Sequence, residues 1–353
     1  MNSVAGEGDF GPQGGDPTRG VSIDLSTCVN RYGPPPAAIA VLREIRPSEI
    51  VMHPYDAPEQ LKGLYEWATK VDRNQLLAGR GASEFIWAMG RNVAHDTVAV
   101  PLPGYTDYLK AFPGRGFSMA GEQVPSLEQL DAAMSAAQLV IISNPHNPTG
   151  AFLPRAGILD VVARHPQSTL VVDESYINFS TNVIDGSCIG CDAANVVVLR
   201  STSKFYGIAA TRAGVAWCRD IDKLKALIGQ QENWGLSGID VRVAIAAVHS
   251  WDWADDARAH MHADSRWLAD ELRDIPGFDL WENQNVHFQY GWTPHATQLA
   301  DVFAAHRVGV RPLGAAHGVH PGALRIVAPR SDERIVVADA IDAVAKAAAD
   351  LSR

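Results

Sequence analysis

Lys204 lies among residue types that suit covalent chemistry on a carbonyl group. It follows residues 195–198, a β-branched run that is typical of a buried strand. Ser201 and Ser203 precede it, and Arg212 comes eight positions after it. Partial burial beside a second cation keeps a lysine amine uncharged enough to attack a carbonyl. The hydroxyls and the guanidinium could together hold a phosphate dianion.

The alternative for a lone segment of this kind is a helix cap followed by a surface lysine. Further apolar runs argue against it, at residues 97–102, 139–142 and 169–172. Each run is followed closely by one candidate site residue, and these are Tyr105, Asn147 and Asp173. Open α/β sheets bind ligands at the carboxyl ends of their strands, so we expect these residues and Lys204 to converge.

Each of the three residue types suits contact with a flat heterocycle. Tyr105 offers an aromatic face for stacking. Pro145 and Pro148 lie on either side of Asn147. They restrict the loop and so fix the direction of the Asn147 amide. Asp173 ends an apolar run, where a buried carboxylate is costly unless it has a partner. A ring that carries a basic nitrogen would be such a partner.

A glycine turn supplies a second candidate for phosphate binding. Residues 76–78 form a strand pattern that ends in a Gly-x-Gly turn, and apolar residues at helical spacing follow. A helix N-terminus presents free amides and a dipole that favours anions, which makes Gly81, Ala82 and Ser83 candidates. The competing interpretation, a dinucleotide site, needs a third glycine and an acidic residue further on, and we find neither.

Together these motifs resemble the cofactor site of fold-type I aminotransferases, which use pyridoxal 5′-phosphate (PLP). The resemblance runs from about residue 24 to residue 329. It is most similar to the branch of histidinol-phosphate aminotransferase and threonine-phosphate decarboxylase. It implies an α/β fold, with a large domain built on a seven-stranded, mostly parallel sheet covered by helices on both faces. A smaller α/β domain completes it.

The resemblance also assigns roles at the cofactor. Lys204 would form a Schiff base with the PLP aldehyde, and Asp173 would keep the pyridine nitrogen protonated, so that the ring accepts electrons. Tyr105 would cover the ring, while Asn147 and Tyr176 would donate to its 3-oxygen. The phosphate would be held by the remaining cofactor candidates, which are Gly81, Ala82, Ser83, Ser201, Ser203 and Arg212.

Substrate and partner contacts follow from the same resemblance. Asn30 and Tyr32 lie in a segment similar to the family's entry loop, and both are expected to contact a small amino substrate. Arg311 and Arg325 would bind its carboxylate or phosphate, since a guanidinium pairs two-pronged with such anions. Tyr55 is expected to reach the cofactor phosphate of the partner in a homodimer.

Departures from the family pattern make an altered substrate plausible. Cys28 stands where an asparagine is usual, and His146 and His287 also lie at motif positions that face the pocket. For His287, a polar residue with satisfied hydrogen bonds is the favoured interpretation.

Length and composition set the domain expectations. With 353 residues, of which 46% are hydrophobic, two domains with a substantial core are expected. The predicted parts are a flexible N-terminal arm at 1–20, a segment contributing to the small domain at 21–45, the large PLP domain at 46–250, and the small C-terminal domain at 251–353.

Charge and motif content exclude several classes. A net charge of −10 with no basic run argues against a nucleic-acid partner. No run is long enough to span a membrane and no signal peptide is evident, so a cytoplasmic protein is expected. Cys188 and Cys191 form a Cys-x-x-Cys without a second ligand pair, so no metal is expected.

Transamination of an amino acid or an amino-alcohol phosphate is therefore the expected activity. The same cofactor could support α-decarboxylation, elimination, cyclisation or oxidation, because pocket shape decides which bond breaks. A regulatory protein with an aminotransferase-like effector domain is a second alternative. It needs a DNA-binding extension, for which the N-terminus is too short and too acidic. A NAD-dependent enzyme is a third alternative.

Overall fold

The computed structural model describes residues 20–92, 97–113, 116–118, 125–181, 183–283, 285–314, 317–351 and 353. The predicted flexible arm at 1–20 lies outside these residues, apart from Gly20.

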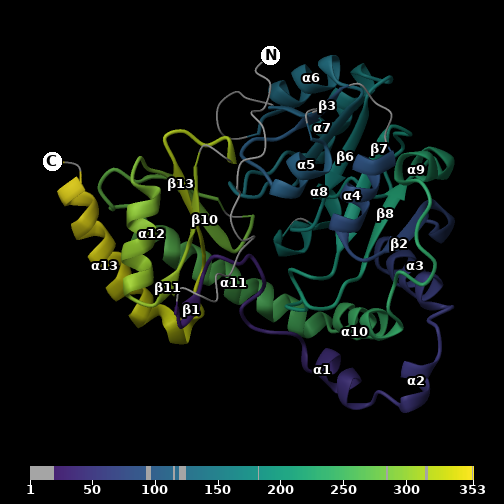
Figure 1. Ribbon diagram of the computed structural model, residues 1–353, viewed down its shortest axis with the longest axis horizontal. Coiled ribbons are helices and arrows are strands. Elements are labelled where there is room, and N and C mark those ends of the chain that lie inside the picture. The colour runs from purple at the N-terminus through teal and green to yellow at the C-terminus, as the bar shows by residue number, and fades with distance from the viewer. Residues whose placement is uncertain are drawn as a thin grey trace.

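A seven-stranded sheet organises the larger part of the chain (Figure 1). Its order is β2 (Leu76–Gly79), β8 (Gly214–Cys218), β7 (Val196–Ser201), β6 (Thr169–Asp173), β5 (Leu139–Ser143), β3 (Val98–Val100) and β4 (Gly116–Ser118). Strand β8 runs antiparallel to both neighbours, and the other pairings are parallel. The predicted seven-stranded, mostly parallel sheet is confirmed.

Helices cover both faces of this sheet because successive side chains of a strand point to opposite faces. Val140 and Ile142 of β5 join the core on one face, and Leu139 and Ile141 join the core on the other. The first face packs against α3 (Ala57–Thr69), α6 (Leu127–Ala136), α7 (Arg155–Arg164) and α10 (Gly238–Val248). The second packs against α4 (Ala82–Asn92), α5 (Thr106–Ala111) and α9 (Ile221–Ile228).

A second, antiparallel sheet forms from the later part of the chain. Its order is β12 (Arg311–Leu313), β13 (Ala323–Val327), β10 (Phe288–Trp292) and β9 (Asp279–Trp281). Three helices share its core, namely α11 (Trp251–Leu272), α12 (Ala296–Ala305) and α13 (Arg334–Leu351). In Figure 1 this group lies beside the main sheet, and α11 runs toward it from α10.

The N-terminal segment joins the C-terminal part of the fold. Strand β1 (Ile23–Asp24) pairs in parallel with β11 (Val308–Gly309). Helix α1 (Pro36–Arg43) then begins at a proline, which suits the first helical position because its missing N–H would have no partner there. Short elements complete the described chain: α2 (Pro47–Val51), η2 (Arg73–Gln75), η3 (Ile177–Phe179), α8 (Val183–Gly186) and η5 (Ser331–Glu333). The domain boundaries at residues 45 and 250 stay predictions.

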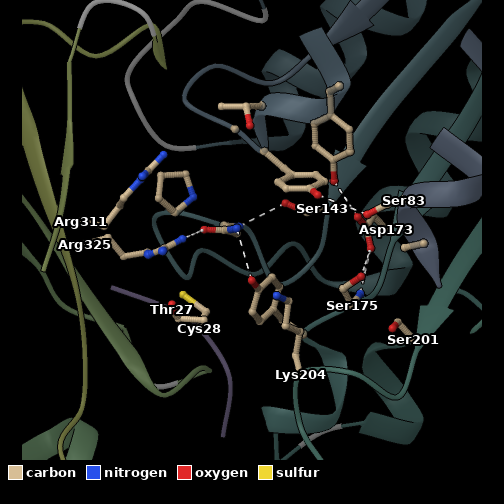
Figure 2. A pocket seen from close by; sticks show the side chains of 18 of the residues that line it. Thr27, Cys28, Ser83, Ser143, Asp173, Ser175, Ser201, Lys204, Arg311 and Arg325 are labelled. Carbon is tan, nitrogen blue, oxygen red and sulfur yellow. Dashed lines mark hydrogen bonds between the residues drawn. The ribbon is translucent and has the colours of Figure 1, made fainter. Parts of the chain in front are cut away.

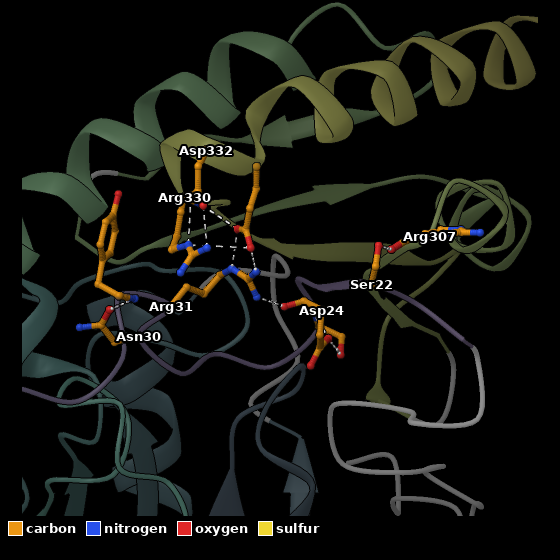
Figure 3. Close-up of polar contacts among 10 residues, drawn as sticks. Ser22, Asp24, Asn30, Arg31, Arg307, Arg330 and Asp332 are labelled. Carbon is orange, nitrogen blue, oxygen red and sulfur yellow. Dashed lines mark hydrogen bonds and ion pairs between the residues drawn. The ribbon is translucent and has the colours of Figure 1, made fainter. Parts of the chain in front are cut away.

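Polar contacts hold the turn after β1 against α11 and the start of α13. The Tyr32 hydroxyl donates to Asp264 Oδ2 at 2.5 Å, and Arg334 donates to Asp264 Oδ1 at 2.6 Å. Arg31, labelled in Figure 3, pairs with Glu333, and the two charged groups are 2.5 Å apart. Since Asp264 is only 3% exposed, these donors compensate a carboxylate that has lost its water.

We expect Tyr32→Phe to destabilise the protein, because it removes a donor from the buried Asp264 carboxylate. The free energy of unfolding, measured by urea denaturation, should fall by about 1–3 kcal/mol. Ser135→Ala is the control, since it removes a hydroxyl from an exposed residue, and it should change stability by less than about 0.5 kcal/mol. Equal denaturation midpoints for the two variants would contradict this role of Tyr32.

Candidate active site

A pocket opens where the carboxyl ends of the central parallel strands face β12 and β13 (Figure 2). Twelve of the residues predicted from the sequence line it. They are Ala82, Ser83, Tyr105, Asn147, Asp173, Tyr176, Ser201, Ser203, Lys204, Arg212, Arg311 and Arg325. The strand-end pattern therefore places these side chains around one cavity, as expected for an open α/β sheet.

Four predicted residues do not line the pocket. Gly81 lies just behind it, with a φ of +81°, and a Cβ there would approach the Arg212 guanidinium to 3.1 Å. Both the backbone angle and the close approach favour glycine. The Tyr32 hydroxyl donates to Asp264, and a contact of Tyr32 with substrate stays a prediction. Tyr55 is mostly exposed, and its contact with a partner subunit stays a prediction.

Asn30, the fourth, supports the lysine loop from behind. Its backbone N–H donates to the Lys204 carbonyl at 2.9 Å, and its side-chain amide donates to the Phe205 carbonyl at 2.7 Å. Asn30 is itself buried, and its direct contact with substrate stays a prediction.

Asp173 is a buried carboxylate that is held by three donors. Ser175 donates to Oδ1 through its backbone N–H at 3.0 Å and its hydroxyl at 2.5 Å. The Tyr108 hydroxyl donates to Oδ2 at 2.8 Å. Burial raises the pKa of Asp173, whereas these hydrogen bonds favour the ionised form and oppose the rise. Both oxygens are thus fixed in direction.

Lys204 follows β7 and presents its amine to the same cavity. Burial lowers the pKa of this amine, and the charges of Arg325 and Arg212 lower it further, while Cys28 and Asp173 act in the opposite direction. A lysine in this setting loses its proton more readily than one in water, as nucleophilic chemistry on a carbonyl requires.

Three polar side chains gather beside Lys204 at one end of the pocket. Ser201 donates to the Ser203 hydroxyl at 3.0 Å, and Arg212 donates to the same oxygen at 3.2 Å. The N-terminal residues of α4, Ala82 and Ser83, line the same cavity. Hydroxyls, a guanidinium and a helix N-terminus together suit a phosphate dianion.

Two arginines occupy the other end (Figure 2). Arg311 and Arg325 are direct partners across the β12–β13 pair. Burial lowers the pKa of Arg311, and the charge of Arg325 lowers it further. Arg325 also donates to Asn147 Oδ1 at 2.7 Å, and so connects β13 to the loop after β5. Two adjacent guanidiniums favour a ligand that carries an anionic group here.

Several lining residues were not predicted from the sequence, among them Thr27, Tyr108, Ser143, Ser175 and His317. Tyr108 lies three positions after Tyr105, so helical spacing could have indicated that both face the site. Ser143 and Ser175 flank predicted residues. His317 lies between β12 and β13, where no sequence pattern marks it.

Of the three departures from the family pattern, only Cys28 lines the pocket. His146 is buried, with Nδ1 2.8 Å from the Thr149 hydroxyl. His287 stacks on Phe179, their ring centroids 3.9 Å apart. The interpretation of His287 as a satisfied polar residue is wrong, because neither ring nitrogen has a hydrogen-bond partner among the described residues. Burial holds the pKa of its imidazole well below the usual value.

The described ranges bear on metal binding and on membrane insertion. Within them, no group of three or more His, Cys, Asp or Glu side chains could hold a metal ion. Cys188 and Cys191 are buried free thiols. None of the helices in the same part of the chain has the length and apolar character needed to cross a membrane.

We expect inorganic phosphate to bind at Ser201, Ser203 and Arg212, and to raise the melting temperature of the cofactor-free protein. Arg212→Gln should weaken this binding by about 10- to 100-fold, since a charge-assisted hydrogen bond contributes about 1.5–3 kcal/mol. The control is Arg219→Gln, which alters an exposed arginine paired with Asp192. A phosphate-dependent rise that survives Arg212→Gln would place the anion elsewhere, such as at the two arginines of β12 and β13.

Comparisons with known proteins agree with this site. The family model described as "Aminotransferase class I and II" matches residues 21–341. A histidinol-phosphate aminotransferase from Symbiobacterium thermophilum is 27% identical over 332 residues, which cover 90% of this chain and 89% of the relative. One from Limosilactobacillus fermentum is 27% identical over 334 residues, covering 89% of each.

Solved structures share the fold. Histidinol-phosphate aminotransferase from Sinorhizobium meliloti, in complex with pyridoxal-5′-phosphate, superposes with a TM-score of 0.82 at 20% identity, covering 94% of this chain and 93% of that one. L-threonine-O-3-phosphate decarboxylase from Porphyromonas gingivalis gives 0.79 at 20% identity, covering 91% and 98%. The chain belongs to the aminotransferase class I and II family, and the predictions of a fold-type I architecture and a PLP-dependent aminotransferase are confirmed.

Proposed function

We propose that this aminotransferase acts on an amino-alcohol phosphate or amino acid, in the manner of histidinol-phosphate aminotransferase. One observation carries the proposal. Lys204 and Asp173 line the same pocket as two clusters of side chains that suit anions. Ser201, Ser203 and Arg212 form one cluster, and the cross-strand pair Arg311 and Arg325 forms the other.

The residues of this pocket fit PLP group by group. Ser201, Ser203 and Arg212 would hold the phosphate, together with the α4 amides. Asp173 would pair with the ring nitrogen, and its fixed carboxylate suits a single, directed partner. Asn147 and Tyr176 lie together, with the amide nitrogen 3.4 Å from the hydroxyl, and would meet the ring oxygen. When bound, PLP supplies an aldehyde that joins amines covalently and a ring that accepts electrons.

The chain's own side chains then divide the work of transamination. Arg325, with Arg311, would bind the substrate through its phosphate or carboxylate and so fix the position of the α-carbon. The Lys204 amine, whose pKa is lowered by burial, would take the proton from that carbon and later return one. Asp173 would hold the proton on the ring nitrogen while charge develops. Tyr105 would cover the ring.

The activity test uses the purified protein with PLP, histidinol phosphate and 2-oxoglutarate. We expect one glutamate to form for each amino group lost. Lys204→Ala should lower kcat by at least about 10³-fold, since it removes both the nucleophile and the general base. Arg219→Ala, on the exposed surface, should leave kcat unchanged. A Lys204→Ala protein that turns over like the wild type would refute the assignment.

The decarboxylase alternative is tested in the same assay with L-threonine O-3-phosphate. Release of carbon dioxide without transfer of the amino group would favour a lyase, whereas glutamate formation alone favours the aminotransferase. Both substrates carry a phosphate, so the two arginines of β12 and β13 would bind either one. The products therefore decide between the reactions.

We also propose a homodimer that buries an exposed aromatic and aliphatic surface near α2. Its members are Ile50, Val51, Met52, Tyr55 and Trp234. His53 stacks on Trp234 with ring centroids 4.3 Å apart, and Tyr55 packs edge-on against the same ring at 6.2 Å. Clustered exposed apolar side chains of this kind mark protein interfaces. Tyr55 does not line the pocket of its own chain, which fits a contact with the partner's site.

Val51→Asp should convert the dimer to monomer, because it places a charge on this surface, where Val51 is 83% exposed. The mass in solution, measured by size-exclusion chromatography with light scattering, should halve. Ile335→Asp is the control, since Ile335 is 78% exposed on α13, far along the chain from this surface. A Val51→Asp protein that keeps the wild-type mass would contradict the proposed interface.

A further inference from the structure

Tyr108 is a buried residue of the pocket to which neither the sequence motifs nor the proposed catalytic steps assign a role. It lies on α5, and its side chain is 1% exposed. Its hydroxyl donates to Asp173 Oδ2 at 2.8 Å. A phenol buried this deeply usually has a hydrogen-bond partner, and here the partner is the carboxylate at the centre of the site.

Tyr108 belongs to a chain of hydrogen bonds whose direction is fixed. An ionised carboxylate only accepts, so the Tyr108 hydroxyl donates to Asp173. Ser143 acts on the same phenol from the other side: hydrogen bonding by its hydroxyl lowers the pKa of Tyr108, which is the effect of a donor to the phenol oxygen. Ser143 Oγ in turn accepts the backbone N–H of Asn147 at 3.1 Å. The chain therefore runs from Asn147 through Ser143 and Tyr108 to Asp173.

This chain links two residues that are proposed to contact the same ring. Asn147 lies in the loop that follows β5, and Asp173 is the last residue of the neighbouring strand β6. Ser143 pairs with Asp173 in the sheet register, so the chain crosses between adjacent strands at their carboxyl ends. Tyr108 comes from α5, so the chain also connects this helix to the site.

We propose that Tyr108, supported by Ser143, is a positioning residue that fixes the Asp173 carboxylate toward the cofactor ring and keeps it in the ionised form. The inference rests on the proposed role of Asp173 at the pyridine nitrogen. The new element is the hydrogen-bond chain through Ser143 and Tyr108 that ends at the Asp173 carboxylate. Tyr108 itself acts only through Asp173.

The expected effect of losing the phenol follows from the groups that face Asp173. These are the titratable side chains Lys204, Tyr105, Tyr108 and Tyr176, together with the Ser175 donors. Burial already raises the pKa of Asp173, and the Tyr108 bond opposes that rise. Without it the pKa rises further, so the carboxylate becomes protonated at a higher pH. A protonated Asp173 cannot pair with a pyridinium, and the loss therefore grows as the pH falls.

The test measures the dissociation constant of PLP for the full-length, cofactor-depleted protein at pH 8 and pH 6, by absorbance titration. For Tyr108→Phe we expect about tenfold weaker binding at pH 8 and a larger loss at pH 6. In the reconstituted enzyme kcat should fall while KM for the amino substrate stays near the wild-type value. Wild-type affinity at both pH values would overturn the proposal.

Tyr290→Phe is the matched control. Tyr290 is buried in β10, and its hydroxyl has no hydrogen-bond partner among the described residues. It should show the wild-type dissociation constant and pH profile. A loss in Tyr290→Phe equal to that in Tyr108→Phe would mean that any missing buried phenol has this effect, and would overturn the proposal.

Ser143→Ala provides a second variant should Tyr108→Phe not fold. It removes the donor to the phenol while keeping Tyr108 in place, so we expect a several-fold loss of PLP affinity with the same dependence on pH. Unchanged affinity in Ser143→Ala would then overturn the proposal. The wild-type titration distinguishes a failure of the proposed function from a failure of the proposed role of Tyr108. A wild type that fails to bind PLP refutes the proposed function, whereas a wild type that binds PLP beside an unaffected Tyr108→Phe refutes only the role of Tyr108.

Discussion

The burial of one carboxylate, that of Asp173, is the constraint on which the site depends. Removing an ion from water costs several kcal/mol unless donors or opposite charges replace the water. Here the replacements come from separate elements: Tyr108 from α5, Ser175 from the turn after β6, and the Lys204 amine from the loop after β7. The relative positions of these elements are therefore set by a single charge, and the ligand that pairs with this charge completes the compensation.

The sequence predicted those parts of the site whose position follows from a strand end. Asn147, Asp173 and Lys204 each follow a run whose residues pack alternately on both faces of the sheet. The alternation and the parallel order together bring their side chains to one edge. The mostly parallel large sheet could be predicted for the same reason, since local periodicity identifies the strands.

Other residues could not be placed in this way, because long-range packing decides where they lie. Tyr32 is separated from Asp264 by more than 200 positions, and only the folded chain shows that they meet. The same holds for Asn30 beneath the lysine loop. For His287 the sequence indicates a polar residue, yet its ring lies flat against Phe179 in an apolar setting. A motif position predicts that a residue is near a site, but not the direction of its side chain.

Charge in the pocket is distributed differently from charge over the whole chain. The protein carries a net charge of −10, yet the pocket sets Arg212, Arg311 and Arg325 against the single carboxylate of Asp173. Arg311 and Arg325 stand directly opposite each other in register, where like charges normally destabilise a strand pair. The repulsion between the two guanidiniums lowers the stability of this strand pair, and an anionic ligand bound between them would offset that loss. Arg212 also favours an anion, because within the described part of the chain its guanidinium donates to the Ser203 hydroxyl and the Ala209 carbonyl and not to a carboxylate. The pocket is thus preorganised for negative charge at both ends and for a proton-bearing ring between them, which is the charge pattern of PLP beside an anionic amino substrate.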